Sequence, residues 1–317
     1  MPSNTPVIAV VGATGAQGSG LVRAILEDPA RRFTARAITR KPDSEKARAL
    51  AAQGAEVVGA DADDQASLER AFSGAAGAFC VTNFWEHFSP DREVAQARAM
   101  ARAAARADVR HVIWSTLEDT RTLVPVSDPR MPTLMGRYKV PHFDGKGEAD
   151  SVFAEAKVPT TWLRTSFYWD NLIHFGMGPR KEPSGQLVFA LPMGDRKLPG
   201  IAAEDIGPCA YGVYLRGAEM VGRSVGIAGE HLTGAQMAAE LSTALGQPVR
   251  YQALPFEAYR KLGFPGADDL GNMFQFKHDF EREFCGARPV DQSRALYPGL
   301  QTFRQWLARH ARQIPLS

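Results

Sequence analysis

Residues 7–26 read VIAVVGATGAQGSGLVRAIL, an apolar run followed by a glycine-rich turn and then by an amphipathic run. The apolar run is typical of a strand buried on both faces, and the amphipathic run is typical of a helix. In the turn, we expect Gly12 to permit the tight reversal, Gly15 to let the backbone approach a ligand, and Gly18 to let helix and strand pack closely. A strand, a G-x-x-G-x-x-G turn and a helix place backbone N–H groups where they hold a pyrophosphate. We therefore predict that this stretch binds a dinucleotide.

The alternation of strands and helices continues to about residue 165. Strands are expected at Val7–Val11, Thr34–Thr39, Ala55–Val58, Ala78–Val81, Val109–Ser115 and Thr160–Arg164. Helices are expected at Gln17–Leu26, Lys46–Gln53, Ser67–Phe72 with Ser67 as its N-cap, Glu93–Ala107 and Glu148–Ala156. This rhythm predicts right-handed βαβ crossovers and an α/β fold, a Rossmann-type doubly wound parallel sheet.

Beyond residue 166 the rhythm changes, because Pro and Gly become frequent and the expected elements are short and scattered. The clearest are a helix at Thr233–Leu245 between an N-cap Thr233 and Gly246, a strand at Val249–Leu254 and a closing helix at Leu300–Arg312. We predict a nucleotide-binding domain at residues 1–165. Residues 166–317 are predicted to form a smaller mixed α/β region for a substrate or partner, with the chain crossing back to the sheet.

Composition argues against several classes of partner. The formal net charge is +2 and no block of Lys and Arg stands out, so a nucleic-acid partner is not expected. Cys80, Cys209 and Cys285 lie far apart without metal-ligand spacing, which predicts reduced thiols and no metal site. No run approaches the roughly 18 apolar residues of a membrane span, and the N-terminal residues lack a leader pattern. We expect a cytoplasmic protein with no membrane partner.

The end of the second predicted strand indicates which cofactor binds. A site that prefers NAD would carry Asp or Glu there to accept a hydrogen bond from the ribose 2′-hydroxyl. This sequence instead continues with Arg40 and Lys41. Two cations suit a 2′-phosphate, and Arg40 could grip it through two hydrogen bonds. The alternative is that both are solvated charges at a strand end. We predict NADP(H).

Two further strand ends carry polar residues suited to the same cofactor. After the third strand comes an acidic turn in which Asp61 is the expected contact to adenine, while its other carboxylates either contribute or only cap the next helix. After the fourth strand, Thr82 and Asn83 could hydrogen-bond the ribose or the pyrophosphate. Phe84 and Trp85 add apolar surface beside them. Both turns fall at the carboxyl edge of the predicted sheet, where ligands bind in such folds.

The catalytic pair of short-chain dehydrogenases, Tyr-x-x-x-Lys on a helix, is incomplete here. Lys146 is present, Pro141 begins the helix, and Ser115 ends the fifth strand at the usual catalytic Ser position, but His142 replaces Tyr. His142 is either the proton donor or a packing residue beside a Lys146 that only anchors the ribose. A neutral imidazole cannot deliver a proton without becoming an imidazolate, which favours packing. Tyr138, in the loop before Pro141, is an alternative acid.

Five motifs together make the sequence resemble a known family: GATGAQG, VTNFWE, HFDGKGE, FYWDNL and YRKLGFPGADDLGNMF. The chain resembles the NmrA-like family, atypical members of the short-chain dehydrogenase superfamily, almost from end to end and most closely its redox-sensor type. The resemblance implies a preference for NADPH over NADH, the absence of the catalytic Tyr, and a change of conformation or association with the cofactor ratio. Other members, such as isoflavone-type and quinone reductases, are catalytic.

The resemblance also implies a role for individual residues. It places the pyrophosphate at Gly12, Thr14, Gly15, Ala16 and Gln17, the 2′-phosphate at Arg40, adenine near Asp61, ribose at Thr82 and Asn83, the nicotinamide ribose at Lys146, and the nicotinamide and substrate-side cleft at Phe167, Tyr168 and Asn171. The Pro-rich stretch 123–139 departs from the family pattern. It is expected to be either a lid over the cleft or a disordered loop.

Three hypotheses follow for the function. The first is a non-catalytic NADP(H)-binding regulator, which the replacement of Tyr by His142 favours. The second is an NADPH-dependent reductase of a small carbonyl, quinone or activated alkene, which an aromatic mouth and a lid would favour. The third, an interaction module with a vestigial site, is weaker because Arg40 and Lys146 are both retained. The expected partner is a protein or a small apolar substrate at that mouth, with a homodimer as one assembly.

Overall fold

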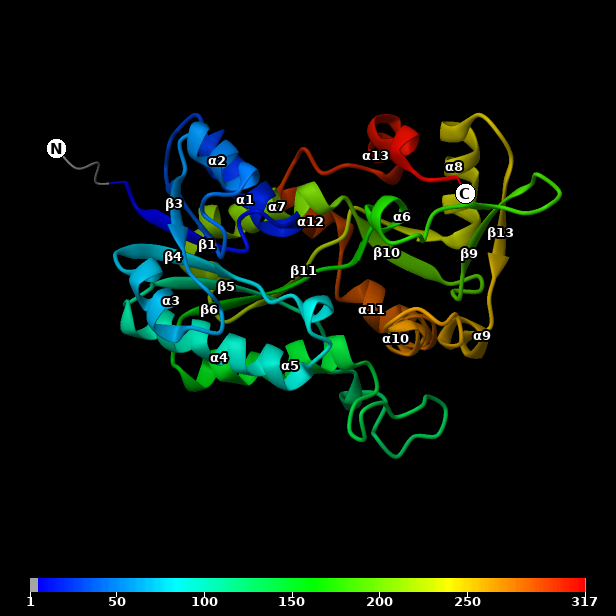
Figure 1. The fold of residues 1–317 in the computed structure, drawn as a ribbon, viewed down its shortest axis with the longest axis horizontal. Helices are drawn as coiled ribbons and strands as arrows, with labels where there is room; N and C mark the ends of the chain where they lie inside the picture. The colour runs from blue at the N-terminus through cyan, green and yellow to red at the C-terminus, as the bar shows by residue number, and fades with distance from the viewer. Residues whose placement is uncertain (1–4, 317) are drawn as a thin grey trace. The chain divides into compact units, whose positions relative to one another are not determined.

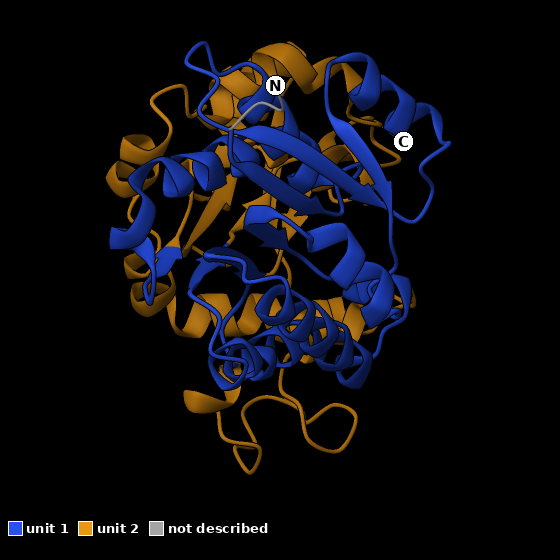
Figure 2. Ribbon diagram, turned by 90° about the vertical axis from the view of Figure 1, so that its left-hand side faces the viewer, with its two compact units in different colours: residues 1–119, 142–164, 204–225 blue, residues 120–141, 165–203, 226–317 orange. Residues whose placement is uncertain are grey.

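The computed structural model describes residues 5–316. Within them the chain divides into two compact units (Figure 2). The first unit comprises residues 5–119, 142–164 and 204–225, and the second comprises 120–141, 165–203 and 226–316. The predicted boundary after residue 165 lies one residue from a point where the chain passes from one unit to the other. The predicted division into domains 1–165 and 166–317 itself stays a prediction.

The first unit is built on a seven-stranded sheet in the order β11-β6-β5-β4-β1-β2-β3 (Figure 1). Its strands are β1 (Val7–Val11), β2 (Thr34–Thr39), β3 (Glu56–Gly59), β4 (Ala75–Cys80), β5 (His111–Thr116), β6 (Thr160–Arg164) and β11 (Ser224–Gly226). Strands β1 to β6 pair in parallel. The strand order reverses between β1 and β4, which is where ligands bind in open α/β sheets. The predicted Rossmann-type fold is confirmed.

Helices cover both faces of this sheet (Figure 1). One face carries α1 (Ala16–Leu26), α2 (Glu45–Ala52) and α7 (Ala203–Arg216), and the other carries α3 (Gln65–Phe72), α4 (Pro90–Arg106) and α5 (Pro141–Glu155). A core of buried side chains joins α3, α4 and α5 to the strands, and its largest members include Phe72, Met100, Trp114 and Phe153. Each large apolar side chain buried in this way contributes roughly 1.5–3 kcal/mol. The core therefore holds the strand ends of this unit in fixed positions.

The predicted elements of the first unit all exist, but one cap was assigned to the wrong residue. Helix α3 begins after Asp64, whose carboxylate accepts the N–H of Ser67 at 3.2 Å. The Ser67 hydroxyl is one turn inside the helix, where it accepts the N–H of Asp61 at 3.0 Å and donates to the Asp64 carbonyl at 2.7 Å. A carboxylate and a hydroxyl cap helices about equally well, so the local sequence could not decide between them.

The second unit contains two three-stranded sheets, in the orders β12-β10-β7 and β13-β9-β8. Its strands are β7 (Phe167–Tyr168), β8 (Arg180–Lys181), β9 (Leu187–Leu191), β10 (Lys197–Ile201), β12 (Glu230–Thr233) and β13 (Val249–Ala253). Its helices are α6 (Asn171–His174), α8 (Gly234–Leu245), α9 (Phe256–Arg260), α10 (Ala267–Asp279), α11 (Glu281–Gly286), α12 (Val290–Leu296) and α13 (Phe303–His310). The caps predicted for α8 are confirmed, with a capping box at Thr233 and a left-handed Gly246.

The segment 120–141 is an ordered part of the second unit rather than a disordered loop. The buried ammonium group of Lys139 donates to the carbonyls of Asp128 and Met131, both at 2.7 Å. The side-chain amide of Asn272 in α10 donates to the carbonyl of Pro132 at 2.9 Å. These contacts tie the two halves of the segment to each other and to a helix of the same unit.

No helix among residues 5–316 combines the length and the apolar character that crossing a bilayer requires.

Candidate functional site

The glycine turn has the geometry that its sequence predicts. Gly12 has a φ of +66°, a left-handed conformation that residues with a side chain rarely adopt. The N–H of Gly15 closes the turn on the Gly12 carbonyl at 2.9 Å. A Cβ on Gly18 would overlap the Gly12 carbonyl and lie 2.9 Å from the Ala13 Cα, so only glycine lets α1 pack this closely against the end of β1.

The N-terminus of α1 is suited to an anion. Its N-cap residue, Gly15, has no side chain to occupy the first N–H groups, and the first turn contains no acidic residue. Gly12, Gly15 and Ala16 are exposed, while Thr14 and Gln17 are half-buried. Backbone donors at the positive end of a helix dipole therefore face solvent beside the switch point of the sheet. These features fit a dinucleotide pyrophosphate.

Arg40, directly after β2, is held by a carboxylate that the sequence analysis did not single out. Its Nη1 lies 2.5 Å from Oε1 of Glu86 and its Nη2 lies 2.9 Å from Oε2, a two-point ion pair. Glu86 ends the short 3₁₀ helix η1 (Phe84–Glu86). Hydrogen bonding to Arg40 lowers the pKa of the Glu86 carboxyl, and Glu86 raises the pKa of Arg40. Lys41 is exposed at the same strand end.

The acidic turn after β3 uses its carboxylates for different purposes. Asp61 is half-buried, and its Oδ1 accepts the N–H of Asp63 at 3.0 Å. Asp63 is exposed and pairs with Arg92 of α4. Asp64 caps α3, which agrees with the alternative that carboxylates of this turn other than Asp61 only cap the next helix. Asp61 therefore sits in a structured turn at the carboxyl edge of the sheet, and its contact with adenine stays a prediction.

Lys146 of α5 is fixed at the end of β4 by a buried network. Its ammonium group lies 2.7 Å from the Thr82 hydroxyl, 3.1 Å from the Thr82 carbonyl and 3.1 Å from Oε1 of Glu93. The Thr82 hydroxyl in turn donates to Oε1 of Glu93 at 2.6 Å. The Glu93 side chain is 0% exposed and that of Lys146 is 12% exposed. The sequence reasoning anticipated Lys146 and Thr82 at the ribose but missed Glu93 entirely.

The buried carboxylate of Glu93 is only partly satisfied. Its Oε2 has no hydrogen-bond partner among the described residues. An isolated buried carboxylate would be expensive, so Lys146 is the cation that compensates it. The sequence marked Glu93 only as an acidic residue in the first turn of α4, together with Asp91. Such residues usually interact with the helix dipole, so this position did not indicate a partner for Lys146.

His142 lies one turn before Lys146 on α5 and is packed among aromatic rings. Its ring centroid is 4.8 Å from that of Trp85, 4.8 Å from that of Phe143 and 5.9 Å from that of Phe84. His142 as a whole is 6% exposed. We call His142, Phe84, Trp85, Phe143 and Phe88 the aromatic cluster, since Phe88 also contacts Trp85 at 5.7 Å.

Two other predicted residues flank these groups. The hydroxyl of the buried Ser115, at the end of β5, donates to the side-chain oxygen of Gln17 at 2.7 Å. This bond ties the predicted catalytic Ser position to the first turn of α1. Asn83 is exposed at the start of η1, where its carbonyl accepts the N–H of Glu86 at 3.2 Å. Predicted residues of the first unit thus take part in three local networks, which connect Ser115 with Gln17, Arg40 with Glu86, and Lys146 with Thr82.

The remaining predicted residues belong to the second unit. Tyr138 is buried, and the guanidinium carbon of Arg137 lies 4.8 Å from its ring centroid. Phe167 and Tyr168 form β7, which pairs in parallel with β10. Asn171 begins α6. The roles predicted for these four residues stay predictions.

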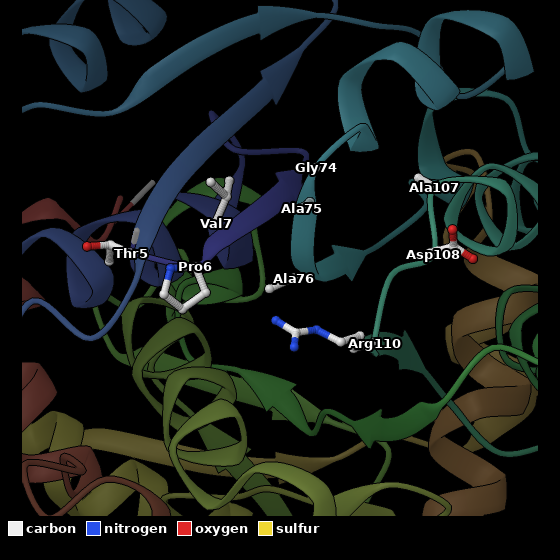
Figure 3. A pocket seen from close by; sticks show the side chains of 9 residues that line it. All are labelled: Thr5, Pro6, Val7, Gly74, Ala75, Ala76, Ala107, Asp108 and Arg110. Carbon is white, nitrogen blue, oxygen red and sulfur yellow. The ribbon is translucent and has the colours of Figure 1, made fainter. Parts of the chain in front are cut away.

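A hollow of about 440 Å³ lies at the end of the large sheet where its parallel strands begin (Figure 3). Its lining comes from the starts of β1, β4 and β5 and consists of Thr5, Pro6, Val7, Gly74, Ala75, Ala76, Ala107, Asp108 and Arg110. The parallel strands run from this edge toward Gly12, so the hollow is separate from the glycine turn. No group of three or more His, Cys, Asp or Glu side chains within residues 5–316 could hold a metal ion.

The sheet order, the glycine turn and the strand-end residues define a Rossmann-type α/β protein of the dinucleotide-binding class. The model of the NmrA-like family matches residues 4–307. The chain therefore belongs to the NmrA-like family, and the resemblance drawn from its motifs is confirmed.

Relatives in this family carry names of two kinds. The NmrA-like family domain-containing oxidoreductase FrzB of Cladobotryum sp is 29% identical over 310 residues, covering 92% of this chain and 89% of the relative. The NAD(P)H azoreductase of Xenophilus azovorans is 30% identical over 275 residues, covering 84% and 86%. NmrA, a negative transcriptional regulator solved in complex with NADP, superposes with a TM-score of 0.77 at 23% identity, covering 96% and 95%. NmrA has also been solved in complex with NAD.

Proposed function

We propose that this protein binds NADP(H) and acts as a redox-responsive regulator with little or no classical dehydrogenase activity. The turn at Gly12 and the N-terminus of α1 would hold the pyrophosphate, and Arg40 would hold the 2′-phosphate. Thr82 and Asn83 would contact ribose, and Lys146 would hold the nicotinamide ribose. When bound, NADPH would be the hydride donor if an acceptor were to reach it. The residues of the chain orient the cofactor and control access to it.

The main support for a regulatory function is the environment of His142. Its ring stands at the Tyr position but packs against Trp85 and Phe143, at 4.8 Å from each. In the catalytic pair, a Tyr next to Lys gives up a proton readily because the cation stabilises the phenolate. His142 has no phenol hydroxyl that Lys146 could activate in this way. His142 is therefore better suited to holding the aromatic cluster than to delivering a proton.

Binding of the cofactor would act on the aromatic cluster through η1. Glu86, the partner of Arg40, is adjacent in the chain to Trp85, which packs on His142. A change at Arg40 can therefore reach the ring surface through a single turn of helix. The accessible part of the aromatic cluster consists of the exposed Phe88 and the half-buried Trp85. We propose that this part receives a protein partner or a small apolar ligand, that the protein forms a homodimer as one of its assemblies, and that it is cytoplasmic.

A second candidate is an NADPH-dependent reductase of a small carbonyl, quinone or activated alkene. It is favoured by the retention of Lys146 on the buried Glu93 and by relatives named as an oxidoreductase and an azoreductase. Because one relative is named an azoreductase, we include azo compounds among the candidate acceptors. Reduction of such an acceptor could begin with transfer of the hydride, so the replacement of Tyr by His142 would not forbid it.

One experiment separates the two candidates. Purified protein is titrated with NADPH and NADH by calorimetry, and NADPH oxidation is then followed with quinones, aldehydes, enones and azo compounds. For the regulator we expect NADPH binding, no turnover above the free cofactor, and altered sedimentation or hydrogen exchange at the aromatic cluster on binding. Turnover that His142→Phe or Tyr138→Phe abolishes, with cofactor affinity retained, would make the protein a reductase instead.

A further inference from the structure

The guanidinium of Arg40 already makes the pair of hydrogen bonds that it would make with a phosphate. Glu86 presents both carboxylate oxygens to Nη1 and Nη2, at 2.5 and 2.9 Å. Guanidinium groups bind carboxylates and phosphates through the same pair of parallel hydrogen bonds. A 2′-phosphate and the Glu86 carboxylate would therefore compete for the same two donors.

The charges around this pair also disfavour a second anion. Asp61 and Asp63 act on Arg40 through space, and together with Glu86 they raise its pKa. Arg92 is itself paired with Asp63. A phosphate that displaced Glu86 would leave the carboxylate near a group carrying almost two negative charges. The 2′-hydroxyl of NAD(H) meets no such repulsion, and it could donate to the carboxylate.

The pair is exposed enough to exchange. The side chain of Arg40 is 53% exposed and that of Glu86 is 43% exposed. Ion pairs in such positions are weak, because water screens the charges and both side chains lose freedom on pairing. Glu86 can therefore reduce the affinity for a 2′-phosphate without abolishing it.

We propose that Glu86 is a specificity-determining residue that narrows the preference for NADP(H) over NAD(H) by occupying Arg40. This inference rests on the proposed binding of NADP(H) near Arg40. A carboxylate usually reads the ribose 2′-hydroxyl from the end of β2. In this protein the residue at the end of β2 is the cation Arg40, and the carboxylate beside it belongs to Glu86 of η1.

Glu86→Gln tests the proposal, since the amide keeps the size of the side chain and removes its charge. The dissociation constants for NADPH and NADH are measured by calorimetry on wild type and variant at one ionic strength. We expect the constant for NADPH to fall about fivefold, because a competing exposed ion pair and a nearby like charge are both removed. The constant for NADH should stay within about twofold or rise, since the charge does not oppose a hydroxyl.

Two controls make the result specific. Asp63→Asn removes an equal charge from the same surface but from a carboxylate that pairs with Arg92, so we expect less than about a twofold change for NADPH. When Arg40→Ala is already present, the gain from Glu86→Gln should shrink to less than about twofold, because the guanidinium for which the carboxylate competes is gone and only the screened like charge remains. Far-ultraviolet circular dichroism and the melting temperature confirm that each variant is folded.

The possible outcomes distinguish this inference from the proposed function. If the wild type binds neither cofactor, the proposed function fails. If NADPH binds but Glu86→Gln leaves the ratio of the two constants unchanged, or weakens NADPH, then Glu86 does not compete for Arg40 and the inference is overturned. A selective gain for NADPH that Asp63→Asn reproduces would assign the effect to general charge and would also overturn it.

Discussion

Two ion pairs of the first unit lie at the ends of β2 and β4, on either side of β1, and they differ in burial. Arg40 and Glu86 form an exposed pair at the end of β2, while Lys146 and Glu93 form a buried pair at the end of β4. The exposed pair holds two flexible side chains against water, so it is easily exchanged. The buried pair also engages Thr82 and cannot open without leaving a charge unpaired in the interior. One end of the candidate site is therefore adjustable and the other is rigid.

Glu93→Gln should have the largest effect and tests the rigid pair. Removing one partner of a buried ion pair leaves the other charge uncompensated, so we expect a loss of about 3 kcal/mol in the free energy of unfolding. Urea denaturation measures it. Glu86→Gln is the matched control at the exposed pair and should cost less than about 1 kcal/mol. Equal losses for the two variants would contradict the difference between the pairs.

Asp150, one turn after Lys146 on α5, extends the comparison to pH. Burial raises the pKa of its carboxyl to about 7, from 3.8, although Thr116 and Trp114 hydrogen-bond to it at 2.6 and 3.0 Å. The folded state therefore binds a proton that the unfolded state has lost, and stability should fall as the pH rises from about 4 to about 7.

The Asp150→Asn variant should lose this decline. Relative to wild type, its free energy of unfolding should gain on the order of 3 kcal/mol between those pH values, since about 1.4 kcal/mol corresponds to one pKa unit. Denaturant titrations at a series of pH values measure the difference. Taking the difference also removes the opposing contribution of the buried His111, whose pKa burial lowers to about 4. Parallel curves for the two proteins would show that Asp150 is ionised in the fold.

Arg40→Ala tests the adjustable end. If Arg40 holds the 2′-phosphate, its removal should weaken NADPH by roughly 30-fold, the loss of a charge-assisted hydrogen-bonded contact, and leave NADH within about twofold. Binding calorimetry with both cofactors measures this. Lys41→Ala removes the adjacent cation and should change NADPH by less than about threefold. An equal loss of NADPH and NADH in Arg40→Ala would show that the assignment to the 2′-phosphate is wrong.

Salt should produce the smallest effect and separate the two pairs directly. Double-mutant cycles for Arg40–Glu86 and Lys146–Glu93 are measured by denaturation at about 0.05 M and 0.5 M salt. The coupling of the exposed pair, about 0.5 kcal/mol at low salt, should nearly vanish at high salt because counterions screen it. The coupling of the buried pair should hardly change. A buried pair with the same salt dependence as the exposed one would mean that water reaches Glu93.

Local patterns were enough to predict the large sheet and the glycine turn, but much of the second unit was not recognised. Helix α10 illustrates the reason: it is buried over most of its length, including Asn272 and Lys277. Where polar and apolar residues are buried alike, the sequence has no separate polar and apolar faces from which a helical period can be read. Helix α8 was found because Thr233 and Gly246 mark its ends chemically.

The sequence by itself determined the turn at Gly12, the alternation of strands and helices, and the cations that follow β2, because each depends on residues adjacent in the chain. Only the tertiary structure decided which distant groups Arg40 and Lys146 contact. Glu86 is 46 residues from Arg40, and Thr82 is 64 residues from Lys146. These partners are set by the order in which β2, β1 and β4 lie side by side, and by the depth at which α4 and α5 cover the sheet. Long-range packing therefore left the Arg40–Glu86 pair exposed and exchangeable and buried the Lys146–Glu93 pair.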